Sequence, residues 1–437
     1  MYSVRHDQWI PRNLSEASIC ASSIALRAAS YLTDPICKAR EYFVRSRMLE
    51  ELPTASPRIS DFVTYVSKLP CCSFLSQDEH VKWIEYCYLR IGACALMALG
   101  SITAPVGIVL RAMTNCTFLH YKGSFSAKER DKNQFSHLLR NICGIKGGYD
   151  IEEGAQMPIR DDLNYPENDR LDRLIMQFKE HDPDVLCLNE VYDINDAHYI
   201  VHALRHRYAH FIIHCGSRTV GPNSGLFFAS KFAVTDAQFL PFPKDMLIDK
   251  AKQCEKGVLV VDIEDSQGVI GTIALTHAQH SDQVQHSSPA EKQARIEECR
   301  FIQQYLEDKD RVVWTGDLNM TDEEMTELSN EDFYKQLTKT VHYVDNKENA
   351  QFTWGGDSWY VRFGNKTADS PTFPTSSDRL KPREISAGCN LDHTMVSENT
   401  MSIESFLVED AISYDPDKIT RESLSDHRGL WSIIDLK

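Results

Sequence analysis

The sequence predicts an α/β domain that follows a helical N-terminal region, and three observations support this. Apolar, strand-like runs recur through the C-terminal two thirds of the chain, and each ends at or near a polar residue. The span Ser15–Leu52 carries Ala, Ile, Leu, Arg and Glu at helical spacing, with Pro35 inside it and Pro53 at its end. Residues 91–110 form a run without a single charge.

The helical region is expected to occupy residues 1–130, and the α/β domain residues 135–437. The span Lys122–Asn133 is polar and charged, which is typical of a linker between two such regions.

The charge-free run Ile91–Leu110 has the twenty residues that a bilayer core demands. It is expected to be a membrane-inserted or re-entrant segment, or a buried helical pair in a globular domain. The second alternative arises because Gly100, Pro105 and Gly107 would interrupt a continuous helix. Basic residues flank both ends, so the orientation in a membrane cannot be assigned.

Composition limits the partners and the compartment. A chain of 437 residues with 42% hydrophobic content can bury a large core. Its net charge of −16 disfavours nucleic acid as a partner, because affinity for nucleic acid depends on Lys and Arg displacing counterions. Thirteen cysteines without metal-type pairing indicate a reduced compartment. The polar start Met1–Pro11 predicts no signal peptide. Composition does not predict an oligomeric state.

The run VVWTGDLNM, Val312–Met320, is the most informative motif. An apolar strand that ends in Asp317 and Asn319 directs both polar side chains to one face. In phosphate ester hydrolysis the carboxylate can orient or activate a water, and the carboxamide can hold a phosphate oxygen. Taken alone, the motif is equally consistent with a simple turn after a strand.

Further polar residues follow other apolar runs in the same way. Loops at one edge of a sheet can bring such residues together from distant parts of the chain. They are Asn141 in LLRNICG, Glu190 at the end of HDPDVLCLNE, His277 after GVIGTIALT, and Asp426 with His427 in LSDHRGL.

Glu190 is the best candidate metal ligand, because a carboxylate that ends a buried run is costly without a cation. Asn141 adds a neutral oxygen, which suits Mg²⁺, with Mn²⁺ as a second option. Asp426 either completes the metal shell or positions its loop. We expect His427 to be the general base, because imidazole titrates near working pH, and Asp392 in CNLDHTMVS to orient it. His277 is expected to donate to the scissile phosphate, whereas its loop neighbours His280 and His286 are expected to be solvated.

The order Asn, Glu, His, Asp-x-Asn, Asp, His resembles the endonuclease/exonuclease/phosphatase superfamily, from about Phe135 to the C-terminus. This resemblance implies a DNase-like sandwich of two mixed sheets with outer helices, and metal-dependent phosphodiester chemistry. GDLNMTDEEM, THAQH, NSGLFFASK and EKGVLVVDI are most similar to the neutral sphingomyelinase branch. Within that branch, Asn223 and Lys256 correspond to substrate-binding positions.

Some residues depart from that branch. Asn189 stands where Gln is usual, and its shorter side chain would support the metal ligand less well. His393 replaces a Tyr. The span Thr353–Asn390 is unfamiliar, and its aromatic residues could contact a lipid interface or pack on the sheet edge. These aromatic residues are Trp354, Trp359, Tyr360 and Phe363.

We therefore expect a Mg²⁺-dependent phosphodiesterase that hydrolyses a phospholipid head group by direct attack of water, as a sphingomyelinase-like phospholipase C does. The protein would be membrane-associated or cytoplasmic. Two alternatives remain, a metal-dependent nuclease on the same fold and an inactive membrane-tethered interaction protein. The net charge of −16 favours the lipid substrate over nucleic acid.

Overall fold

The protein is represented by a computed structural model. The described residues are 4–5, 21–32, 35–36, 39, 42, 78–112, 117–129, 133–144, 149–151, 154–156, 170–216, 222–281, 287–329, 337–338, 353, 390–397, 400–408, 425 and 427–437.

Two mixed β-sheets form the centre of the described structure. The larger sheet contains β1 (Val4–Arg5), β2 (Leu119–Lys122), β3 (Gln134–Gly144), β6 (Val185–Val191), β7 (His210–Ile213), β8 (Phe227–Ser230), β15 (Met401–Val408) and β16 (Gly429–Leu436). The smaller sheet contains β9 (Ala233–Pro241), β10 (Gly257–Asp265), β11 (Gly268–His277), β12 (Val312–Asp317), β13 (Leu337–Thr338) and β14 (Asp392–Ser397). Their strand orders are β1-β2-β7-β8-β6-β3-β16-β15 and β13-β14-β12-β11-β10-β9. A separate ribbon pairs β4 (Tyr149–Ile151) with β5 (Gly154–Gln156).

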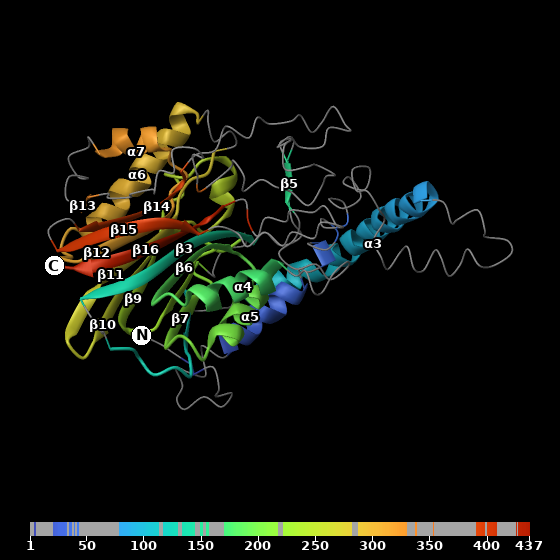
Figure 1. Ribbon diagram of the computed structural model, residues 1–437. Coiled ribbons are helices and arrows are strands. Elements are labelled where there is room, and N and C mark those ends of the chain that lie inside the picture. The colour runs from blue at the N-terminus through green and yellow to red at the C-terminus, as the bar shows by residue number, and fades with distance from the viewer. Residues whose placement is uncertain are drawn as a thin grey trace.

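Helices cover the outer faces of the two sheets (Figure 1). They are α4 (Arg170–His181) and α5 (Ile194–Leu204) on the larger sheet, and α6 (Pro289–Leu306) and α7 (Asp322–Ser329) on the smaller one. A short 3-10 helix, η3 (Asp249–Gln253), precedes β10. The order of layers is therefore helix, sheet, sheet, helix.

Alternation along the strands divides the apolar side chains among three cores. In β3, Leu138 faces α4 and α5, while the next residue, Leu139, lies between the sheets. In β12, Val313 lies between the sheets and Trp314 packs beneath α6. Successive strand residues point to opposite faces, so an unbroken apolar run can line two cores at once. The predicted two-sheet α/β sandwich is confirmed.

Strand direction explains why the polar ends meet. The parallel strands β3 and β6 approach one edge of the larger sheet with Asn141 and Glu190. The parallel strands β11 and β12 finish side by side at His277 and Asp317. The antiparallel strand β14 begins at the same edge, where Asp392 lies opposite Asp317. The carboxyl ends of both parallel pairs therefore share one rim of the sandwich.

The N-terminal residues 21–32 are helical and contact the domain at the start of α5. Ser30 Oγ donates to Asp193 Oδ1 (3.3 Å), and Arg27 Nε donates to Asn195 Oδ1 (3.3 Å). The strand β2 lies N-terminal to the expected boundary at residue 135, yet it pairs with β7 inside the larger sheet. The sheet thus includes residues from the region that the sequence suggested was separate.

Helix α3 (Asp78–Ala112) is continuous, although the sequence suggested interruptions within it. A proline removes one amide donor and displaces the carbonyl four residues before it. Within this helix Ser101 Oγ donates to the Met97 carbonyl (2.8 Å). The residues expected to interrupt the run were Gly100, Pro105 and Gly107.

Most of the apolar surface of α3 faces outward. Within Tyr86–Leu110 an 18-residue window has a mean hydropathy of 2.0, and only 22% of that window is buried. Ile91 is 71% exposed and Ile102 is 74% exposed. In Figure 1, α3 extends away from the sheets. The segment is therefore not the buried helical pair that was one alternative, and it is long and apolar enough to cross a membrane.

Candidate active site

The backbone around Glu190 is strained into position. Glu190 ends the buried run of β6 with a φ of +64°, in the left-handed region that non-glycine residues rarely adopt. Gly225 lies against it, and a Cβ at Gly225 would stand 3.0 Å from Glu190 Cα and 2.8 Å from Tyr192 Cε1. Val191 N also donates to the Gly225 carbonyl (2.8 Å). Such strain persists only where the surroundings enforce it, and it gathers at functional sites.

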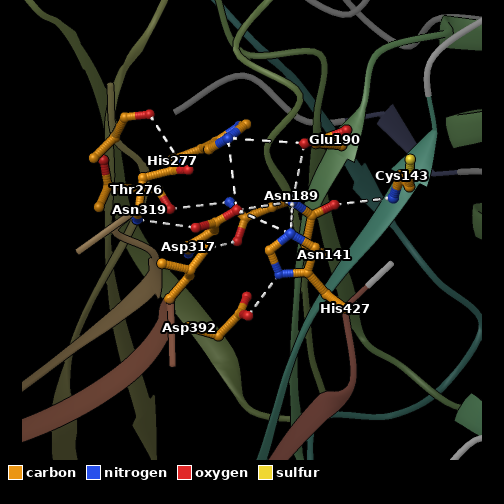
Figure 2. Close-up of polar contacts among 12 residues, drawn as sticks. Asn141, Cys143, Asn189, Glu190, Thr276, His277, Asp317, Asn319, Asp392 and His427 are labelled. Atoms are coloured by element: carbon orange, nitrogen blue, oxygen red, sulfur yellow. Dashed lines mark hydrogen bonds and ion pairs between the residues drawn. The ribbon is translucent and has the colours of Figure 1, made fainter. Parts of the chain in front are cut away.

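Asn141 links the carboxylates of the two sheets (Figure 2). Its Nδ2 donates to Glu190 Oε1 (3.0 Å) and to Asp317 Oδ2 (2.9 Å). Its Oδ1 accepts from the Cys143 amide (2.9 Å). Two acidic side chains from different sheets thus converge on one amide group. Like charges that meet in this way need a cation or strong donors to hold them together.

The second group of residues is a histidine with a buried carboxylate. His427 Nδ1 lies 2.7 Å from Asp392 Oδ2, and both residues are buried. The other ring nitrogen, Nε2, lies 3.6 Å from Asp317 Oδ2. Ser425 Oγ accepts from the His427 amide (3.2 Å) and donates to the Asn141 carbonyl (2.8 Å), which ties this loop to β3.

His277 completes the rim. Its Nε2 lies 3.9 Å from Glu190 Oε1 and 3.8 Å from Asp317 Oδ2. On its other side, the Tyr192 hydroxyl lies 3.5 Å from Nδ1. Burial lowers the pKa of His277 well below its ordinary value, and the nearby Lys256 lowers it further. The ring is therefore neutral at physiological pH.

Asp317 lies between the other groups. Burial raises its pKa to about 6, and this shift is opposed by His427 and by the hydrogen bond from Asn141. Its Oδ1 accepts from the Asn319 amide (3.0 Å), which turns the chain back at the end of β12. Gly316 is required just before it, because a Cβ there would stand 1.9 Å from the Thr276 carbonyl oxygen of β11.

Asn189 has a role that the sequence did not suggest. Its Nδ2 donates to the Thr276 carbonyl (2.9 Å), and its Oδ1 accepts from the Asp317 amide (3.0 Å). The side chain therefore joins β6 of the larger sheet to β11 and β12 of the smaller one. Asn189 is connected to Glu190 as its neighbour along the backbone of β6. The other departure, His393, is buried, and its Nε2 lies 2.8 Å from the Met320 carbonyl.

The two expected substrate-binding residues are buried and bonded to backbone groups. Asn223 Nδ2 donates to the Tyr192 carbonyl (2.9 Å), and its Oδ1 accepts from the Gly225 amide (2.7 Å). Lys256 Nζ donates to the carbonyls of His277 (3.3 Å) and Ala278 (2.5 Å). In this structure both side chains support the site rather than face it. A role in substrate binding stays a prediction.

The structure joins most of the predicted site residues and leaves a few outside the described residues. Together at the rim are Asn141, Glu190, His277, Asp317, Asn319, Asp392 and His427. His280 is half-buried, although it was expected to be solvated. Outside the described residues lie Asp426, His286 and the aromatic residues Trp354, Trp359, Tyr360 and Phe363.

Two residues at the site were missed by sequence reasoning. Tyr192 follows Glu190 by two positions, so the alternation of a strand would have placed both on one face. Glu298 lies in the middle of α6. Its side chain accepts from the backbone amide of Gln279, two residues after His277, and nothing in the sequence indicates this contact.

The donor set fits a hard divalent cation. Ligand atoms of Glu190, His277 and Asp317 lie within 4.8 Å of one another, and a second such group joins Asp317 to Asp392 and His427. Carboxylate oxygens and a nearby carboxamide are the ligands that Mg²⁺ prefers. Asn141 would need to turn its oxygen toward the ion, which is an exchange of two nearly isosteric groups.

Comparison with known proteins assigns the chain to a family. The model of the endonuclease/exonuclease/phosphatase family matches residues 151–427. The chain belongs to this family of phosphodiesterases and phosphatases.

Two curated relatives are sphingomyelin phosphodiesterases. Sphingomyelin phosphodiesterase 3 of Mus musculus is 28% identical over a region that covers 32% of this chain and 22% of that protein. Sphingomyelin phosphodiesterase 5 of Danio rerio is 26% identical, over 32% of this chain and 26% of that protein. The matched region thus spans only a minor part of either relative.

A solved structure shares the fold. The beta toxin of Staphylococcus aureus superposes with a TM-score of 0.50 at 15% identity, over 68% of this chain and 99% of that one. At such low identity the similarity concerns the fold alone.

Proposed function

We propose that the protein is a Mg²⁺-dependent phosphodiesterase of the phospholipase C type that hydrolyses the head group of a phospholipid such as sphingomyelin. The observation that carries this proposal is the convergence of Glu190, Asp317 and Asn141 beside the His427–Asp392 pair. The similarity to sphingomyelin phosphodiesterases supports the choice of a lipid diester.

Glu190 and Asp317, with Asn141, are the residues that would hold the metal ion. A bound Mg²⁺, or Mn²⁺ in its place, would neutralise charge on the phosphoryl oxygens. The carboxylates of Glu190 and Asp317 would supply the negative charge that binds the ion. Both already contact the same small group, the Asn141 amide. Asp426 remains a further candidate for this site.

The proton chemistry belongs to the histidines. Asp392 accepts the Nδ1 proton of His427, so that Nε2 is left as the base toward the rim. A water beside Nε2 at the rim would lose a proton to His427 as its oxygen bonds to phosphorus. The bond between phosphorus and the lipid oxygen would break, and the lipid alcohol would leave with a proton taken from water. His277 Nε2–H would donate a hydrogen bond to one phosphoryl oxygen, and the Asn319 side chain would donate one to another.

The exposed apolar helix supports a membrane location. Exposure of large side chains such as Ile91, Ile102 and Val109 to water would be unfavourable by roughly 25 cal/mol per Å². We infer that α3 inserts into a bilayer and keeps the catalytic domain near its lipid substrate. Such tethering raises the effective concentration of a bilayer substrate.

The test offers purified protein sphingomyelin in detergent micelles and, separately, plasmid DNA, each with Mg²⁺ and with EDTA. Release of phosphocholine that stops in EDTA and returns with Mg²⁺ would support the proposal, and His427→Ala serves as the inactive control. Cleavage of DNA alone would favour the nuclease. Absence of hydrolysis of either substrate, with a folded protein, would favour the inactive interaction protein.

A further inference from the structure

The Ala278 amide still donates to the Asp317 carbonyl of β12 (2.9 Å), and buried charged side chains also hold the chain that follows His277. Lys256 donates to the carbonyls of residues 277 and 278, as described above. Glu298 Oε2, on the outer helix α6, accepts from the Gln279 amide (2.9 Å). A lysine and a glutamate thus bind three consecutive residues that carry the site histidine.

Arg295, one turn earlier in α6, extends this set of contacts. Its Nη1 donates to Ser281 Oγ (2.8 Å) and to the Gln279 carbonyl (3.4 Å), and its Nη2 donates to Glu324 Oε1 of α7 (2.7 Å). The Gln279 side chain accepts from the amide of Ile248, just before η3. The segment His277–Ser281 is therefore joined to α6, to Lys256 just before β10 and to Ile248 just before η3, and Arg295 links it in turn to α7.

The burial of these groups is unusual for a purely structural contact. Glu298 and Arg295 are both 0% exposed, and Lys256 is 3% exposed. Glu298 Oε1 has no hydrogen-bond partner among the described residues. Burial raises the pKa of Glu298 to about 7 against the opposing effects of the Gln279 amide, Lys256 and Arg295. An apolar side chain would fill this place at lower cost, so the carboxylate is retained for the amide that it accepts.

We propose that Glu298 is a positioning residue that, through the Gln279 amide, holds His277 at the distance from Glu190 and Asp317 that catalysis needs. Glu298 itself does not face the rim. His277 is the last residue of β11, so a shift of the chain that follows it could move the histidine at the strand end, and a displacement of about 1 Å can lower a rate by about 10²-fold. This inference rests on the proposed phosphodiesterase activity.

Two substitutions distinguish the effect of the Glu298 side-chain length from the effect of its charge. Glu298→Asp keeps the charge beside Lys256 but is one methylene too short for the Gln279 amide. Glu298→Gln keeps the acceptor at the same distance and removes the charge. We expect Glu298→Asp to lower kcat about 10- to 100-fold with KM changed less than about 3-fold, because the contact acts on the transition state. Glu298→Gln should retain kcat within about 3-fold.

The control is Gln303→Leu, a buried position of the same helix that is not joined to residues 277–281 by any contact in the described structure. It should leave kcat unchanged. Equal losses in Glu298→Asp and Gln303→Leu would show a general packing effect and overturn the proposal. A loss in Glu298→Gln with wild-type kcat in Glu298→Asp would assign the effect to charge and overturn the proposal. Equal losses in the two variants would show that the acceptor at the wild-type distance is not sufficient, and would overturn it as well.

Amide hydrogen exchange gives a readout that does not depend on activity. Peptides that span residues 277–281 should exchange faster in Glu298→Asp than in the wild type, and at the wild-type rate in Glu298→Gln. A wild type that hydrolyses no diester while this exchange pattern appears would refute the proposed function and leave the contact intact. Unchanged exchange in Glu298→Asp would refute the positioning role directly.

Discussion

Replacement of Asp392 by Asn tests whether the buried carboxylate works through His427. Asp392 Oδ2 lies 2.7 Å from Nδ1, and Oδ1 has no hydrogen-bond partner among the described residues. Among the described residues, the hydrogen bond of this carboxylate is to the imidazole. When His427 takes a proton from water, this negative charge stabilises the imidazolium that forms.

The expected loss follows from that geometry. An Asn side chain either donates to Nδ1, which moves the ring proton to Nε2, or accepts without negative charge. In the first case the base is blocked, and in the second the imidazolium is unsupported. Both outcomes approach removal of the base itself, so kcat should fall about 10²–10⁴-fold, or about 3–5 kcal/mol in the barrier. Asn has nearly the same volume, so the fold should survive.

The assay is kcat for detergent-dispersed lipid with Mg²⁺, measured for Asp392→Asn, His427→Ala and the double variant. If Asp392 acts through His427, the double variant should be no slower than His427→Ala, because residues that act as a unit are not additive. Asp184→Asn is the matched control. Asp184 is a buried carboxylate at the other end of β6, bonded to Lys128 (2.9 Å), and its loss should lower stability and leave kcat unchanged. A folded Asp392→Asn protein with near-wild-type kcat would refute the reasoning.

Three further predictions follow from the metal site, the N-terminal region and the buried glutamate. Glu190→Gln should weaken Mg²⁺ affinity and regain part of its activity at high Mg²⁺, as titration of activity would show; activity unchanged in EDTA would contradict a metal at this site. A protein of residues 117–437 keeps β2 in the sheet and lacks α3, so it should stay soluble and hydrolyse detergent-dispersed lipid, while only the full-length chain floats with liposomes. The folded-state pKa of Glu298 is raised from 4.5 to about 7, so the folded state holds the extra proton between these values and stability falls as pH rises through them. Urea unfolding in EDTA measures this effect. Between pH 4.5 and 7 the free energy of unfolding of the wild type should fall by up to about 3 kcal/mol relative to that of Glu298→Gln. Parallel pH profiles of the unfolding free energy for the two proteins would contradict this.

Much of the rim could be predicted from the chain alone. Asp317 and Asn319 follow a buried strand, and Glu190 and His277 follow two others, so their positions mark strand ends directly. Parallel strands bring such ends to a single edge whatever the order of the strands within a sheet. The same reasoning paired His427 with Asp392, since a base needs an acceptor on its other nitrogen.

The N-terminal region shows where local rules were insufficient. Proline and glycine inside residues 91–110 predicted an interrupted helix, yet α3 continues through them. A proline inside a helix costs about 3 kcal/mol and a glycine about 1 kcal/mol, yet the surroundings of a residue can override such local preferences. The strand β2 lies within residues 1–130, which were expected to be helical, because four residues carry too weak a periodic pattern to show that they pair with β7.

The sequence by itself determined the polar residues of the site, their order along the chain and the α/β character of the domain, because alternation and strand ends are local properties. Only the tertiary structure decided what each buried polar group contacts. It directed Lys256 toward backbone carbonyls, joined the two sheets through Asn189, and set Glu298 of an outer helix against the Gln279 amide. Those contacts link residues 19–128 positions apart in the chain, and a hydrogen bond depends on distances of tenths of an ångström that no local pattern encodes.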